Sequence, residues 1–160
     1  MKSNTSNEEN LVYVFDIDGT ITIDNGDSFH VTDDGKFIQN VSNDTPIYDM
    51  KLLIDSLYAG GGLIVYCTAR YENVRKQTIT WLKKHDFAFD HLYMRKNGDY
   101  RRSSIVKLEY MDEIKNKHGY ICSVFENNLE TVKLLRHHGY NAMLCDVKKN
   151  VVKLNTNEHW

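Results

Sequence analysis

Short apolar runs alternate with amphipathic helical stretches along this chain. The runs hold about five residues each, are rich in β-branched and aromatic side chains, and do not strictly alternate with polar residues, as expected of strands buried on both faces. They are Leu11–Phe15, Leu63–Cys67, His91–Met94, Ile121–Phe125 and Asn141–Cys145. Between them, apolar residues at helical spacing predict helices within 47–58, 74–82, 106–114 and 129–135. This alternation predicts an α/β fold, a three-layer Rossmann-like parallel sheet with helices on both faces.

A chain of 160 residues is long enough for one domain with a real core and too short for two. We expect the domain to span residues 11–150, between a flexible polar leader at 1–10 and a tail at 151–160. Within it, two alternating stretches, Ser28–Val31 and Lys36–Val41, flank an Asp-Gly pair, which is a strong hairpin signal. The hairpin is expected to form a small flap, at about 24–43, after the first strand.

Composition argues against several classes of protein. No apolar run approaches the roughly 20 residues of a membrane-spanning helix, and no signal peptide opens the chain, so we expect no membrane partner. Three cysteines are too few and too scattered for a disulfide framework, and we expect free thiols and a cytoplasmic location. Residues 1–50 hold ten acidic residues against two lysines, whereas residues 70–107 hold ten basic residues against four acidic ones. That division suits a metal-and-phosphate site, although solvated faces explain it as simply.

Acidic residues follow the first and fourth predicted strands, at the carboxyl ends where a parallel α/β sheet binds its ligands. Asp16 and Asp18 come directly after the first strand, and Gly19-Thr20 turn the chain away. Glu126 ends the fourth strand. Burying such carboxylates requires a cation or a polar partner; a surface turn rich in Asp and Gly is the alternative for the first pair. Oxygen ligands without histidine or cysteine suit Mg²⁺ and not zinc.

Residues that suit phosphate accompany these acids. Thr68-Ala69-Arg70 follow the second strand, where a hydroxyl and a guanidinium can hold phosphate oxygens, unless Thr68 caps the next helix. Lys107 lies near the start of the third helix, which Ser103 or Ser104 is expected to cap. The side chain of this lysine would face either the site or the solvent.

Together these pieces resemble the four motifs of the haloacid dehalogenase-like phosphatase superfamily. The first motif, Asp16-Ile17-Asp18-Gly19-Thr20, is highly specific, and Thr68, Lys107 and Glu126 follow in the same order. The resemblance extends from Leu11 to Cys145. Within the superfamily the chain is similar to the 3′-phosphatase domain of bacteriophage polynucleotide kinase/phosphatase, most visibly in Thr68-Ala69-Arg70 and between Leu92 and Arg101. The phosphate-binding loop of a kinase half is not present in the sequence.

The resemblance implies a Mg²⁺-dependent phosphomonoesterase, from a phage or bacterial source, that acts on 3′-phosphorylated DNA or RNA ends. Asp16 would be the nucleophile that forms an aspartyl-phosphate, and Asp18 the general acid and base. Asp16, the backbone carbonyl of Asp18 and Glu126 would hold Mg²⁺, while Thr68 and Lys107 would bind the transferred phosphoryl group. The remaining expected substrate-binding residues are Gly19, Thr20, Ala69, Arg70 and Arg101.

Two positions depart from the family pattern. The polynucleotide phosphatases usually have Asp-Asp-Arg where this chain has Glu126-Asn127-Asn128, and an acidic residue is common where it has Ser103. Two alternatives therefore stand beside the 3′-phosphatase: a phosphatase of nucleoside monophosphates or small metabolites, and a catalytically weak module that binds nucleic-acid ends. A small flap leaves the site open to a polymer end, and Tyr71, Tyr93 and Tyr100 are candidates for stacking on bases.

Overall fold

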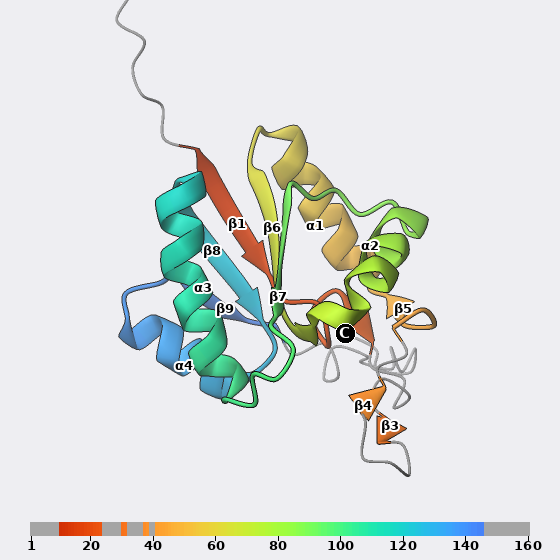
Figure 1. Ribbon diagram of the computed structural model, residues 1–160. Coiled ribbons are helices and arrows are strands. Elements are labelled where there is room, and N and C mark those ends of the chain that lie inside the picture. Colours follow the sequence, from red (N-terminus) through yellow and green to blue (C-terminus); the bar gives the residue numbers. More distant parts are fainter. Residues whose placement is uncertain (1–9, 24–29, 32–36, 39–40, 146–160) are drawn as a thin grey trace, which may run out of the picture.

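A five-stranded parallel sheet forms the centre of the protein (Figure 1). The computed structural model describes residues 10–23, 30–31, 37–38 and 41–145. In the order of the sheet, the strands are β7 (His91–Arg95), β6 (Leu63–Tyr71), β1 (Leu11–Phe15), β8 (Tyr120–Glu126) and β9 (Ala142–Leu144). The predicted α/β fold is thereby confirmed.

Helices cover both faces of this sheet (Figure 1). On one face lie α1 (Tyr48–Ala59) and α2 (Arg75–Lys84), the latter preceded by the short helix η1 (Glu72–Val74); on the other lie α3 (Ser103–His118) and α4 (Leu129–His137). Successive side chains of β1 point to opposite faces, as the pleat of a strand requires. Val14 packs toward α3 and α4, whereas Phe15 packs toward α1 and α2. The sheet is therefore packed between two apolar cores, one on each face, and these cores hold the strands that lead to the candidate site in place.

Two of the differences from the expected element boundaries affect residues of the site. Strand β6 continues four residues past Cys67, so Thr68 lies within the strand and is not a helix cap. Helix α3 begins at Ser103 with Arg102 as its N-cap and without a side-chain capping hydrogen bond, so the prediction of a serine cap is wrong. The helix starts one residue earlier than a Ser103 cap allows, and this places both serines inside its first turn.

The segment between β1 and α1 contains two short antiparallel pairs. Strand β2 (Thr22–Ile23) pairs with β5 (Thr45–Pro46), and β3 (His30–Val31) pairs with β4 (Phe37–Ile38), as the predicted hairpin requires. The turn of that hairpin, most of the expected flap, residues 1–9 of the leader and the tail lie outside the described residues. Among the described residues, no helix is both long and apolar enough to cross a membrane. The three cysteines are free.

Candidate active site at the carboxyl edge of the sheet

Strands β1, β6 and β8 end at the same edge of the sheet (Figure 1). Most of the polar residues singled out in the sequence meet there. The amide of Asp16 donates a hydrogen bond to the carbonyl of Phe125 (2.9 Å), which extends the pairing of β1 with β8 by one residue. Asp16 and Glu126 are thereby brought side by side. Beyond Asp16 the chain turns tightly, because the amides of Ile21 and Thr22 both donate to the carbonyl of Ile17.

A buried lysine joins these two acids. Lys107 Nζ lies 2.7 Å from Asp16 Oδ1 and 2.5 Å from Glu126 Oε2. All three residues are buried, with Glu126 only 1% exposed. Of the two orientations left open for Lys107, the structure has the one that faces the site. Glu126 is fixed at its second oxygen as well, since Oε1 accepts a hydrogen bond from the amide of Asn128 (2.9 Å).

The cluster formed by Lys107, Asp16 and Glu126 contains two acidic side chains and only one basic side chain. Burial raises the pKa of Asp16 to about 7, and repulsion from Glu126 adds to the rise, while Lys107 opposes it. Burial works against the charge of Lys107, yet the two carboxylates raise the pKa of its ammonium above the usual range. One ammonium shared by two buried carboxylates leaves a net negative charge in a region of low dielectric, where charge is costly.

A buried arginine holds the second acid of the first motif. Arg70 is fully buried, and its Nε donates to both oxygens of Asp18 (3.0 Å each) while Nη2 donates to Oδ1 (2.7 Å). Nη2 also pairs with the carboxylate of Asp44. The Asp44 carbonyl in turn accepts a hydrogen bond from the indole of Trp81 on α2 (2.9 Å). Arg70 therefore faces Asp18 and Asp44, and a direct contact with substrate stays a prediction; Nη1 has no hydrogen-bond partner among the described residues.

The other residues expected to bind substrate are divided between the cluster and the surface. The Thr20 hydroxyl lies 3.4 Å from Asp16 Oδ2, and that of Thr68 lies 3.4 Å from Asp18 Oδ2. The carbonyl of Ala69 accepts a hydrogen bond from Arg95 Nε (3.3 Å). Arg101 is not brought into the cluster: its side chain is half exposed and forms ion pairs with Asp99 (2.8 Å) and Glu109 (2.5 Å).

Asn127 and Asp44 take part in the site, although the sequence analysis assigned neither a role. Gly19 has a φ of +80°, and a Cβ added there would lie 2.1 Å from Asn127 Nδ2, so the Asn127 amide packs directly on the turn after Asp18. The replacement of an acid by Asn127 thus keeps a side chain at the site. Asp44 carries no local signal in the sequence; only its contact with Arg70 identifies it.

The donor set fits a hard divalent cation. In the part of the chain that the structure describes, no three acidic, histidine or cysteine side chains form a ready-made metal site. However, Asp16 and Glu126 share one ammonium, as Asp18 and Asp44 share one guanidinium. Asp16 and Glu126 therefore bring two carboxylates to the single ammonium that they both contact. Oxygen donors with excess negative charge suit Mg²⁺.

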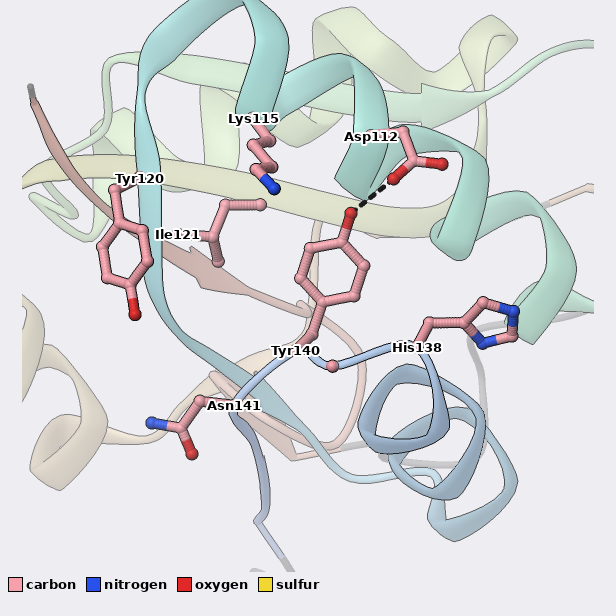
Figure 2. A pocket seen from close by; sticks show the side chains of 8 residues that line it. Asp112, Lys115, Tyr120, Ile121, His138, Tyr140 and Asn141 are labelled. Carbon is pink, nitrogen blue, oxygen red and sulfur yellow. Dashed lines mark hydrogen bonds between the residues drawn. The ribbon is translucent and has the colours of Figure 1, made fainter.

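A separate cavity of about 220 Å³ lies at the opposite end of the sheet, at the amino ends of β8 and β9 (Figure 2). Tyr120 and Ile121 at the start of β8 line it, together with the loop that leads into β9. Figure 2 shows Tyr140 pointing toward Asp112, to which its hydroxyl donates a hydrogen bond (2.5 Å). The full length of β8 separates this cavity from Glu126, so it is not part of the candidate site.

Comparison with known proteins agrees with this geometry. The family model of the polynucleotide kinase PNKP phosphatase domain matches residues 10–149. Among solved structures, a chain in the "Pnkp1/Rnl/Hen1 RNA repair complex" and one in a second structure of a Pnkp1/Rnl/Hen1 complex are each 18% identical, with TM-scores of 0.72 and 0.73. The matches cover 90% and 91% of this chain but only 45% and 48% of the others, so the chain spans less than half their length. No curated protein matches.

Proposed function

The chain belongs to the family of polynucleotide kinase phosphatase domains, which are haloacid dehalogenase-like, and from this premise we propose that it is a Mg²⁺-dependent phosphomonoesterase that removes 3′-phosphates from polynucleotide ends. One observation carries the proposal: the carboxylate of Asp16, at the end of β1, lies against the buried ammonium of Lys107. A carboxylate nucleophile beside a fixed cation is what attack on an anionic phosphate needs.

In this proposal Asp16 is the nucleophile, and Asp18 is the general acid and then the general base. The Asp16 carboxylate attacks phosphorus, which forms an aspartyl-phosphate and breaks the bond to the 3′-oxygen, while Asp18 donates a proton to that leaving oxygen. In the second step Asp18 takes a proton from the attacking water, and hydrolysis returns phosphate and the free Asp16 carboxylate. The contacts of Arg70 with both oxygens of Asp18 hold the ionised carboxylate in place, which is the form that takes the proton from water in the second step.

Lys107 and Thr68 are the residues that would receive the transferred phosphoryl group. The Lys107 ammonium neutralises charge on the phosphoryl oxygens, and the Thr68 hydroxyl donates a hydrogen bond to them. The Asp16 and Glu126 carboxylates and the Asp18 backbone carbonyl would hold Mg²⁺. When bound, the ion offsets the repulsion between the anionic nucleophile and the substrate dianion. Glu126 suits this task because Lys107 and the Asn128 amide already fix its two oxygens.

Two observations support a polynucleotide rather than a small metabolite as the substrate. One of the two similar chains named above comes from a structure of an RNA repair complex, and the other comes from a structure of a Pnkp1/Rnl/Hen1 complex. In addition, an open groove of about 560 Å³ lies over η1 and α2, directly after the end of β6, and three basic side chains line it beside one acid, Glu72, and three uncharged residues. The basic side chains belong to Arg75, Lys76 and Lys83. Arg75 is paired with Glu72 (2.6 Å), which leaves Lys76 and Lys83 as the basic side chains of this groove that can contact a phosphodiester backbone.

Phosphate release from a 3′-phosphorylated oligonucleotide, with Mg²⁺ present, tests the proposal. We expect turnover by the wild type, and its loss both in Asp16→Asn and on addition of a chelator. Faster turnover of a nucleoside 3′-monophosphate than of the oligonucleotide would favour the metabolite alternative. Tight binding of the oligonucleotide without turnover would identify a binding module instead.

A further inference from the structure

Tyr100 is an exposed aromatic residue in the loop that follows β7, the neighbour of β6 in the sheet. It lies in the loop between β7 and α3, and 79% of its surface is exposed. It has no hydrogen-bond or ring partner among the described residues. Burying an aromatic ring is favourable, so a ring left this exposed is available to a ligand.

The loop that carries Tyr100 is held firmly on both sides of it. The buried guanidinium of Arg95 donates through Nη1 to the carbonyls of Asp99 (2.9 Å) and Arg101 (2.6 Å), the two neighbours of Tyr100 in the chain. The Asp99 carboxylate also accepts a hydrogen bond from the amide of Arg101 (3.1 Å), which closes a turn around Tyr100. Holding the backbone this way lowers the entropy that the loop would lose when a ligand binds.

The same arginine connects this loop to the site. Arg95 Nε donates to the carbonyl of Ala69 (3.3 Å), and Ala69 stands between Thr68 and Arg70 in β6. On the other side, the loop leads directly into α3, whose second turn carries Lys107. The loop that carries Tyr100 therefore follows the carboxyl end of β7 and lies between the strand that presents Thr68 and the helix that presents Lys107.

We propose that Tyr100 is a stacking platform for the nucleobase of the nucleotide that carries the 3′-phosphate; this inference rests on the proposed function. Every base has an aromatic face, so stacking holds a polynucleotide end without reading its sequence. The other two candidate tyrosines are less suited, because both are only partly exposed. The Tyr93 hydroxyl is hydrogen-bonded to His118 (2.8 Å), and the ring of Tyr71 lies under the Arg95 guanidinium.

Binding measured without turnover tests the stacking separately from catalysis. In an Asp16→Asn background, we would measure the Kd of fluorescently labelled 3′-phosphorylated oligonucleotides by anisotropy, with either a normal or an abasic terminal nucleotide. Tyr100→Ala should weaken binding of the normal end about tenfold and leave binding of the abasic end unchanged. Tyr100→Phe, which keeps the ring, should restore binding of the normal end.

Tyr120→Ala provides the matched control, since Tyr120 is also exposed (54%) but lies at the opposite end of the sheet. The stacking role would be overturned if Tyr100→Ala weakened binding of the normal and the abasic end equally, or weakened neither. It would also be overturned if the Asp16→Asn protein bound neither end. Phosphate release by the wild type is a separate readout. A protein that binds with the expected Tyr100 dependence but releases no phosphate would refute the activity and retain the stacking subsite.

Discussion

Lys107 Nζ lies 2.7 Å from Asp16 Oδ1 although 91 residues separate the two in the chain. The contact joins the first turns of α3 to the end of β1 and is buried on both sides. Two consequences follow from it. The fold depends on the ammonium to neutralise two buried carboxylates, and the proposed catalysis depends on the same ammonium to bind phosphoryl oxygens. Stability and activity are therefore coupled at Lys107, and suitable variants can separate them.

Replacing Lys107 with Met should abolish phosphate release and also destabilise the protein. The free energy of unfolding, measured with urea, should fall by about 3 kcal/mol, because Asp16 and Glu126 are left buried without a cation. Adding Glu126→Gln removes one of these charges and should recover part of the lost stability without recovering activity. If Lys107→Met were as stable as the wild type, the two carboxylates would not depend on this ion pair.

The raised pKa of Asp16 predicts how stability changes with pH in the metal-free protein. Burial raises this pKa from 3.8 to about 7, so between these values the folded protein holds a proton that the unfolded chain has released. The contribution of Asp16 to stability therefore falls as pH rises through this window. Asp16→Asn removes the titration, and in the presence of a chelator it should raise the Tm at pH 8 by a few degrees relative to the wild type.

The same comparison at pH 4 supplies the control, since Asp16 is largely protonated there in the folded wild type and the substitution should change the Tm little. Thermal melts of both proteins at the two pH values measure the effect. An increase in Tm of the same size at pH 4 and pH 8 would attribute the stabilisation to something other than the charge of Asp16.

The sequence predicted the sheet and its helices well because their signal is local. Apolar runs and helical stripes report burial directly, and the observed strands and helices differ from the predicted ranges mainly at their ends. The extension of β6 beyond Cys67 had no such local signal. Arg70 is a charged residue that local patterns place outside a buried strand, and it is buried because Asp18, 52 residues away, and Asp44, 26 residues away, pair with it.

The candidate site likewise contains some residues that local sequence patterns identify and others that they do not. The acids of the first motif could be identified from their position after a strand, but the sequence left Lys107 facing either the site or the solvent. The side chain turns inward because Asp16 and Glu126 lie there, and neither is its neighbour in the chain. Asp44 could not be found at all, since an acid before a short strand has no distinguishing pattern. Tertiary partners decide these positions, and a single sequence does not display them.

Asp44→Asn should lower kcat for phosphate release about tenfold with little change in KM. The Asp44 carboxylate pairs with Arg70, and Arg70 in turn holds Asp18, the proposed general acid. Loss of this negative charge loosens the guanidinium, so proton transfer suffers while the groups proposed to bind phosphate stay in place. Asp49→Asn is the matched control, because Asp49 is exposed in the first turn of α1. A rise in KM without a fall in kcat would place Asp44 in substrate binding instead.

Gly19→Ala should destabilise the protein more than an equivalent change at another glycine with positive φ. Gly19 has a φ of +80°, and the added Cβ would also lie 2.1 Å from Asn127 Nδ2. Gly61 has a φ of +86° and nothing within 4 Å of a Cβ, so Gly61→Ala measures the backbone cost alone, about 1 kcal/mol. Urea unfolding should show a larger loss for Gly19→Ala, and adding Asn127→Ala should bring it back to the Gly61→Ala value. Equal losses at the two glycines would mean that the Asn127 amide can move aside freely and does not support the turn that presents Asp18.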